Sequence, residues 1–158
     1  MGEQIPSRGD LHQPPETIES LLSLVREILQ MDVAFVSEFA GDQLIFRALE
    51  GDAETFGWRE GESIPLDESY CKRVLDGRLP NVVPDARRQD STKELWVTRE
   101  ANIGSYVAVP VVLCDGRPYG TLCCVSHKAD PGLRERELGL MEGVARELSR
   151  RIKREGLR

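Results

Sequence analysis

The sequence predicts an α+β fold in which an antiparallel sheet of five to six strands packs against helices. Strand-like segments occur as consecutive pairs joined by short turns, and this hairpin order places neighbouring strands antiparallel. The long amphipathic segments lie at the two ends of the chain and do not alternate with strands, which disfavours a parallel sheet. The 158 residues, 40% of them hydrophobic, are enough for one domain with a core. We expect that domain over residues 16–155, after a flexible, Pro- and Gly-containing leader over residues 1–15.

The charge balance bears on the partners of the domain. Lys and Arg number 21 and Asp and Glu number 27, so the net charge is −6. An acidic chain repels phosphate backbones, and we therefore expect no nucleic-acid partner. The apolar runs are too short for a transmembrane helix, and the first residues lack the pattern of a signal peptide. A cytoplasmic protein without a membrane partner is the resulting expectation.

The first half of the chain predicts a helix, a hairpin and a loop. Thr17 is a suitable N-cap, and the apolar residues after it recur at steps of three and four up to Met31. A hairpin follows, with strands over residues 32–40 and 44–49 around a Gly41-Asp42 turn. The acidic, Gly-punctuated segment 51–69 is predicted as a solvated loop, or alternatively as an acidic rim that discourages anionic partners.

The second half predicts a short helix, a polar connection and another hairpin. Gly77 ends the short helix as a left-handed cap. Pro110 has no backbone N–H, so its strand must be bulged or open on one side at that point. The expected segments are a helix over 69–77, a brief strand over 81–83, helical turns around 95–97, and hairpin strands over 105–113 and 119–126.

A long helix over residues 133–154 closes the chain with a heptad-like apolar seam. A second apolar helix at the other end of the domain makes this seam a candidate dimer contact. The alternative is that the same stripe packs on the chain's own sheet. The residues assigned to the homodimer helices are Leu21, Val25, Ile28, Leu138, Met141, Ala145, Leu148 and Ile152.

The cysteine and histidine pattern does not support a metal site. The four cysteines are Cys71, Cys114, Cys123 and Cys124, and none forms a Cys-x-x-Cys pair. In a reducing cytoplasm we expect free thiols that mostly fill the core, with a reactive thiol as the alternative. Consecutive strand residues point to opposite faces, so Cys123 and Cys124 should not share a ligand or a bond.

Several short motifs together resemble the GAF domain, a small-molecule sensor module related to the PAS fold. The most typical are the strand Ser105-Tyr-Val-Ala-Val-Pro110, the turn Asp115-Gly116 and the strand Tyr119-Gly-Thr-Leu122. The resemblance covers roughly residues 18–154. It implies terminal helices on one face of the sheet and short helices over the ligand face. The particular residues of these motifs look most like those of GAF domains attached to bacterial signalling outputs, such as cyclic-di-GMP phosphodiesterases. The resemblance therefore also implies an output domain or a partner protein.

The resemblance also implies a ligand site that is apolar and aromatic with few polar groups, which suits a flat or apolar small molecule. The motifs of cyclic-nucleotide, covalent bilin and haem sites do not occur, so the cofactor stays open. The alternative is that these side chains fill the core and no ligand exists. The candidate lining residues are Tyr70, Cys71, Val74, Trp96, Val97, Tyr106, Ala108, Thr121 and Cys123.

The predicted function is therefore a non-enzymatic sensory and regulatory domain of bacterial signal transduction. It would bind a small molecule and relay the signal through its terminal helices as a dimer. One alternative is a thiol enzyme similar to free methionine-R-sulfoxide reductase, for which Cys71 and Cys123 could approach one another across the pocket. The other alternative is a ligand-free dimerisation module.

Overall fold

The computed structural model describes residues 17–133 and 136–155, and the predicted leader over 1–15 lies outside the described residues. The described chain contains a six-stranded, fully antiparallel sheet with strand order β3-β2-β1-β6-β5-β4. This confirms the predicted fold class. The strands are β1 (Val33–Ala40), β2 (Gln43–Gly51), β3 (Ser63–Pro65), β4 (Val82–Val83), β5 (Ser105–Val112) and β6 (Pro118–Ser126).

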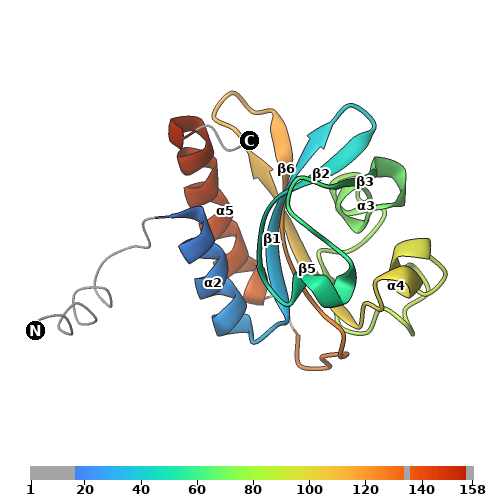
Figure 1. Ribbon diagram of the computed structural model, residues 1–158. Coiled ribbons are helices and arrows are strands. Elements are labelled where there is room, and N and C mark those ends of the chain that lie inside the picture. The colour runs from blue at the N-terminus through green and yellow to red at the C-terminus, as the bar shows by residue number, and fades with distance from the viewer. Residues whose placement is uncertain (1–16, 134–135, 156–158) are drawn as a thin grey trace, which may run out of the picture.

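The helices form two separate layers around the sheet, as Figure 1 shows. The long helices α2 (Ile18–Leu29) and α5 (Arg136–Glu155) lie side by side on one face. The short helices α3 (Tyr70–Leu75) and α4 (Trp96–Glu100) cover the opposite face. Helices α2 and α5 thus meet although most of the described chain separates them. Within the described part of the chain, no helix combines the length and apolar character needed to cross a bilayer.

Helix α2 begins and ends where its capping residues require. The Thr17 hydroxyl accepts a hydrogen bond from the Ser20 backbone N–H at 3.0 Å. Gln30 adopts a left-handed conformation with φ 56°, and its N–H bonds back to the Arg26 and Glu27 carbonyls. The helix therefore ends slightly before the predicted Met31, which is itself buried beneath it.

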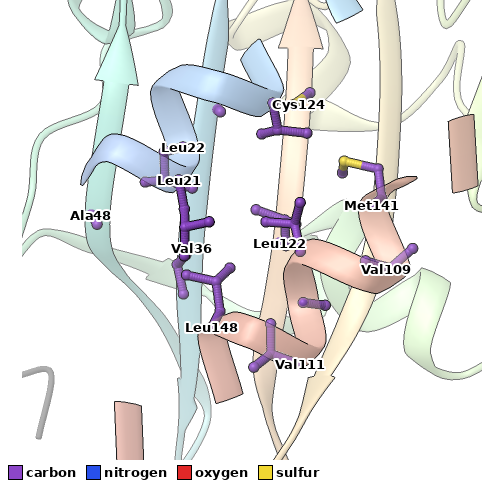
Figure 2. Packing of buried hydrophobic residues seen from close by; sticks show 14 of the residues in the cluster. Leu21, Leu22, Val36, Ala48, Val109, Val111, Leu122, Cys124, Met141 and Leu148 are labelled. Carbon is purple, nitrogen blue, oxygen red and sulfur yellow. The ribbon is translucent and has the colours of Figure 1, made fainter. Parts of the chain in front are cut away.

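The stripe assigned to the dimer helices mostly faces the chain's own sheet. Figure 2 shows side chains of both helices pointing toward the sheet, with Leu148 beside Val36 and Leu122. Of the assigned residues, Ile28 is 54% exposed and Leu138 is half-buried, and the others are buried in the domain. The stripe is therefore the packing face that holds α2 and α5 on the sheet, as the alternative interpretation expected. A helix-mediated dimer stays a prediction, and it would use outward side chains such as Ile28 and Leu24, which is 40% exposed.

The acidic segment over residues 51–69 is more structured than a solvated loop. It contains strand β3 and two 3-10 turns, at Ala53–Phe56 and Leu66–Glu68. Phe56, Trp58 and Leu66 are buried beneath its acidic surface. The loop prediction failed because charge and glycine content describe the outer side of the segment, while its few large apolar residues pack on the sheet.

Pro110 lies on an open sheet edge, as its missing N–H requires. The edge strand β4 pairs only with Val107 and Tyr106 of β5. The Ala108 N–H bonds to the Asn81 carbonyl at 2.9 Å, and by strand alternation the nitrogen of Pro110 faces the same side, beyond the end of β4. On its other side β5 pairs with β6 along its full length.

Candidate functional site

The candidate site is the face of the sheet opposite α2 and α5, which we call the lid face. It is covered by α3, α4 and the 3-10 turns of the acidic segment. Aromatic rings form most of its interior. Trp58 stacks on Phe46 and on Phe56 with ring centroids 5.2 and 5.0 Å apart. Phe35 meets the same indole edge-on at 5.2 Å.

The interior of the lid face holds one small cavity of about 20 Å³. This volume is enough for a single water-sized molecule and far too small for a nucleotide or a chromophore. The lid face is therefore largely filled by side chains in this conformation. The cavity is lined by Phe35, Leu44, Phe46, Trp58, Ile64, Ser69, Tyr70, Cys71, Val97, Ile103 and Tyr106.

A polar group of five buried side chains lies at the bottom of the lid face, and we call it the thiol cluster. Its two sulfur atoms, Cys71 Sγ of α3 and Cys123 Sγ of β6, are 3.4 Å apart. The Tyr106 hydroxyl is 3.5 Å from each sulfur. Thr121 Oγ1 lies 3.2 Å from Cys123 Sγ and 2.8 Å from the Ser37 hydroxyl, which donates to Cys71 Sγ at 3.8 Å.

The two thiols of the cluster differ in acidity. Burial raises the pKa of Cys71, but hydrogen bonds from Cys123, Thr121, Tyr106 and Ser37 outweigh burial and lower this pKa to about 7. Burial, followed by the neighbouring Cys71, holds the pKa of Cys123 well above its ordinary value. The first proton of the pair therefore leaves Cys71, and its thiolate is held by hydrogen-bond donors.

Titration of the folded protein tests this assignment. We expect one thiol to ionise near pH 7, visible as thiolate ultraviolet absorbance, in a Cys114→Ser background that removes the exposed thiol. Because the folded pKa lies below the ordinary 9.0, the thiolate stabilises the fold above pH 9 and this contribution is lost as the pH falls through 7. The added substitution Cys71→Ser should remove the step. A step that survives it would contradict the assignment.

Tyr70 lies between solvent and the small cavity of the lid face. We call this cavity, with the buried aromatic rings around it, the chamber. Its hydroxyl donates to the Thr98 hydroxyl, which in turn donates to the Thr92 carbonyl at 2.7 Å. Burial raises the pKa of Tyr70 to about 12, so the phenol stays protonated and keeps donating. Thr98 also lines an open surface cleft of about 370 Å³, together with Arg87, Lys93, Arg99 and Asn102. The Tyr70–Thr98 contact thus separates the inner cavity from a surface cleft that carries three cationic side chains.

His127 contacts the other end of the segments that cover the lid face, which together we call the lid. Its ring stacks on Phe56 with centroids 3.8 Å apart. Its Nδ1 donates to the Asn102 carbonyl at 2.7 Å, and its Nε2 lies 2.8 Å from the Thr55 hydroxyl. Arg87 donates to the carbonyls of Asn102 and His127 at 3.3 and 2.6 Å. These contacts join the acidic segment and the loop after α4 to the end of β6.

All but one of the predicted lining residues lie on the lid face. Tyr70, Cys71 and Val74 of α3 are buried there with Val97, and Tyr106, Ala108, Thr121 and Cys123 reach it from the sheet. Trp96 is the exception and corrects the prediction, because its side chain is 47% exposed on the outer side of α4. In a helix of five residues only one side can face the sheet, and Val97 and Thr98 occupy that side.

The aromatic half of the chamber was missed by sequence reasoning. Phe35 and Phe46 lie in the first hairpin, and Phe56 and Trp58 lie in the segment predicted as a solvated loop. Strand alternation was a usable signal for Phe35, which is directly opposite Cys123 in the register of β1 and β6 and therefore shares its face. The sequence carries no comparable periodic signal for Phe56 and Trp58.

The architecture defines a class of α+β domain in which paired terminal helices cover one face of an antiparallel sheet and short elements enclose an apolar chamber on the other. The family model described as "GAF domain" matches residues 13–152. The chain belongs to the GAF domain family.

Known proteins similar to this chain include a signalling enzyme and sensor domains. A cyclic di-GMP phosphodiesterase of Pseudomonas aeruginosa is 25% identical over 138 residues, which cover 87% of this chain and 22% of that protein. The chain thus spans about a fifth of the length of this curated relative.

Solved structures that share the fold include the following two. The GAF domain region of a Geobacter sulfurreducens protein has 20% identity and a TM-score of 0.67, covering 86% of this chain and 90% of that one. A far-red cyanobacteriochrome photoreceptor has 18% identity and a TM-score of 0.66, covering 87% of this chain and 84% of that one.

Proposed function

We propose that this GAF domain is a non-catalytic sensory and regulatory module that binds a small, largely apolar molecule on its lid face. The observation that carries the proposal is one apolar cavity that is lined by Tyr70, Cys71, Val97 and Tyr106 of the predicted residues and by the rings of Phe35, Phe46 and Trp58. Sites for small organic ligands are concave, mostly apolar and supplied with a few polar groups. Here those polar groups are the thiol cluster and the Tyr70 hydroxyl.

Binding at this face requires the lid to move, because the present cavity holds only a water-sized molecule. The lid consists of helices of six and five residues and of 3-10 turns, which carry little stability of their own. Breaking the Tyr70–Thr98 contact would join the chamber to the outer cleft. An acidic group on the ligand would there meet Arg87, Lys93 and Arg99.

The central strands provide the route from the lid face to the terminal helices. Ser37 of β1 and Thr121 of β6 belong to the thiol cluster, while their neighbours Val36 and Leu122 pack under α2 and α5. A shift of either strand therefore acts on both faces of the sheet. We propose that the domain passes this shift through its terminal helices, as a homodimer, to an output domain or partner protein of bacterial signalling. The phosphodiesterase relative supports such an output.

Native mass spectrometry of the protein purified from its host tests the binding proposal. We expect a retained small molecule on the wild-type chain. Tyr70→Phe keeps the ring but removes the hydrogen bond to Thr98, so it should exchange that molecule faster. The matched control Trp96→Phe changes an exposed ring and should leave exchange unchanged. Protein that carries no molecule, and that acquires none from a host extract in either variant, would contradict the proposal.

A ligand-free dimerisation module is the second candidate, and the filled lid face favours it. In that case the aromatic chamber is a second hydrophobic core that only stabilises the domain. The same mass spectra separate the two candidates, because a dimer without any retained molecule supports the module. A monomer at micromolar concentration contradicts it.

One observation supports the thiol-enzyme alternative, and another opposes it. Cys71 and Cys123 are within 3.4 Å, as a reductase pair requires, but the cavity beside them is too small for methionine sulfoxide. We therefore favour the non-catalytic module. Incubation with free methionine-R-sulfoxide and a dithiol reductant tests the alternative. Turnover that is lost in Cys71→Ser and in Cys123→Ser would establish the enzyme in place of the module.

A further inference from the structure

The lid helix and the central sheet meet at two sulfur atoms. Cys71 and Cys123 are 52 positions apart in the sequence, and their Sγ atoms are 3.4 Å apart. Cys71 is on α3 of the lid, whereas Cys123 is on β6 in the middle of the sheet. The two thiols are close enough to bond after a small movement of either side chain. Such a bond would connect two layers of the domain.

The surroundings of this pair differ from those of the neighbouring cysteine. The Tyr106 hydroxyl lies 3.5 Å from both sulfurs, and Thr121 and Ser37 add further hydroxyl contacts. These donors stabilise a thiolate, which is the nucleophilic form of cysteine. Cys124 points into the opposite core beneath α2 and α5, where burial raises its pKa to about 12. It is a matched control with equal burial but without the hydroxyl contacts.

The cavity beside Cys71 decides which oxidant can reach the pair. Its volume of about 20 Å³ admits a molecule of the size of water, and Ser69, Tyr70 and Tyr106 line it with Cys71. Hydrogen peroxide is only slightly larger than water. A glutathione disulfide would not fit without opening of the lid.

We propose that Cys71 and Cys123 form a peroxide-sensitive dithiol whose disulfide locks α3 onto β6. In the first step the Cys71 thiolate attacks one peroxide oxygen, the O–O bond breaks, and the released hydroxide takes up a proton to become water. Cys71 is then a sulfenic acid. In the second step the Cys123 sulfur attacks Cys71 Sγ, the S–O bond breaks, and a second water leaves with the Cys123 proton. Two thiols and one hydrogen peroxide thus give one disulfide and two waters.

This redox property goes beyond the proposed ligand-binding function. The disulfide would keep the lid closed over the chamber and so oppose entry of any molecule that needs α3 to move. The two proposals are tested by different readouts, since a chain can form the disulfide and bind nothing, or bind a ligand and stay reduced.

Peptide mapping after peroxide treatment tests the dithiol. The full chain carrying Cys114→Ser is folded, treated with one equivalent of hydrogen peroxide, quenched with N-ethylmaleimide and analysed by mass spectrometry. We expect the loss of two hydrogens per chain, fragment ions that join Cys71 to Cys123, and full reversal by dithiothreitol. The further substitution Cys124→Ser should leave this bond unchanged. Cys123→Ser should leave Cys71 as a sulfenic acid that dimedone traps.

Two results would overturn the proposal. One is oxidation of Cys71 to sulfinic acid in the Cys114→Ser chain without any bond to Cys123. The other is that Cys71 and Cys123 of the Cys114→Ser chain both stay reduced until the domain is unfolded. A thermal melt gives an independent readout, because closing this loop should raise the melting temperature of the oxidised chain by about 10 °C. An unchanged melting temperature would contradict the lock between α3 and β6.

Discussion

Replacing Leu148 with glutamate is expected to unfold the domain. Leu148 has no exposed surface and lies beside Val36 and Leu122 of the sheet (Figure 2). Loss of a buried leucine costs about 3 kcal/mol, and a buried carboxylate without a partner adds several more. The total is comparable with the whole stability of an ordinary domain, about 5–15 kcal/mol. Circular dichroism with urea unfolding should show little or no folded protein at 25 °C.

Ile28→Glu is the matched control for this change. Ile28 belongs to the same predicted dimer stripe but is 54% exposed on α2, so the free energy of unfolding should change by less than about 0.5 kcal/mol. If α2 contributes to a dimer, this variant should remain folded but sediment as a monomer. Leu148→Glu protein with a wild-type unfolding midpoint would contradict the packing of α5 on the sheet.

Replacing Gly120 with alanine is expected to cost about 4 kcal/mol or more. A Cβ atom at this position would lie 1.8 Å from the Ser37 carbonyl oxygen and 2.9 Å from the Glu38 Cα, both in the backbone of β1. Gly120 is paired with Glu38 in the central strand pair, so relief of the clash requires β1 and β6 to separate. Chemical denaturation should show a large loss of stability, and the nearby thiol cluster should become accessible to alkylation.

Gly139→Ala controls for the intrinsic effect of this substitution. Gly139 lies in α5, and a Cβ there would meet no atom within 4 Å. Alanine favours a helix over glycine by about 0.5–1 kcal/mol, so this variant should be more stable than the wild-type chain. Equal loss of stability in both variants would show that the close approach of β1 and β6 is not the cause.

Much of the fold was predictable because regular periodicity reports which side of an element is apolar. Hairpin order predicted antiparallel pairing, which the register of all six strands confirms. In β5, strand alternation puts Val107 and Val109 on one face and Tyr106 and Ala108 on the other, and the two pairs lie in separate cores. The same rule correctly separated Cys123 from Cys124.

Periodicity does not report what covers an apolar face, so the partner of each apolar stripe could not be predicted from the sequence. The stripe on α5 has the same pattern whether a second chain or the domain's own sheet lies against it, and the tertiary structure places it on the sheet. Trp96 was assigned to the ligand site from its position in the family resemblance, yet the direction of a side chain on a single short helical turn depends on the contacts of that turn. Phe56 and Trp58 were overlooked because isolated rings in an acidic segment have no period at all.

The fold class, the opposite directions of Cys123 and Cys124 and the chemical groups available to a site follow from the amino-acid sequence. The contact between Cys71 and Cys123, the contact between Tyr70 and Thr98 and the filling of the lid face follow from tertiary packing. The physical reason is that strand and helix patterns arise from local backbone geometry, whereas contacts across 52 positions of the chain depend on how complete layers pack together.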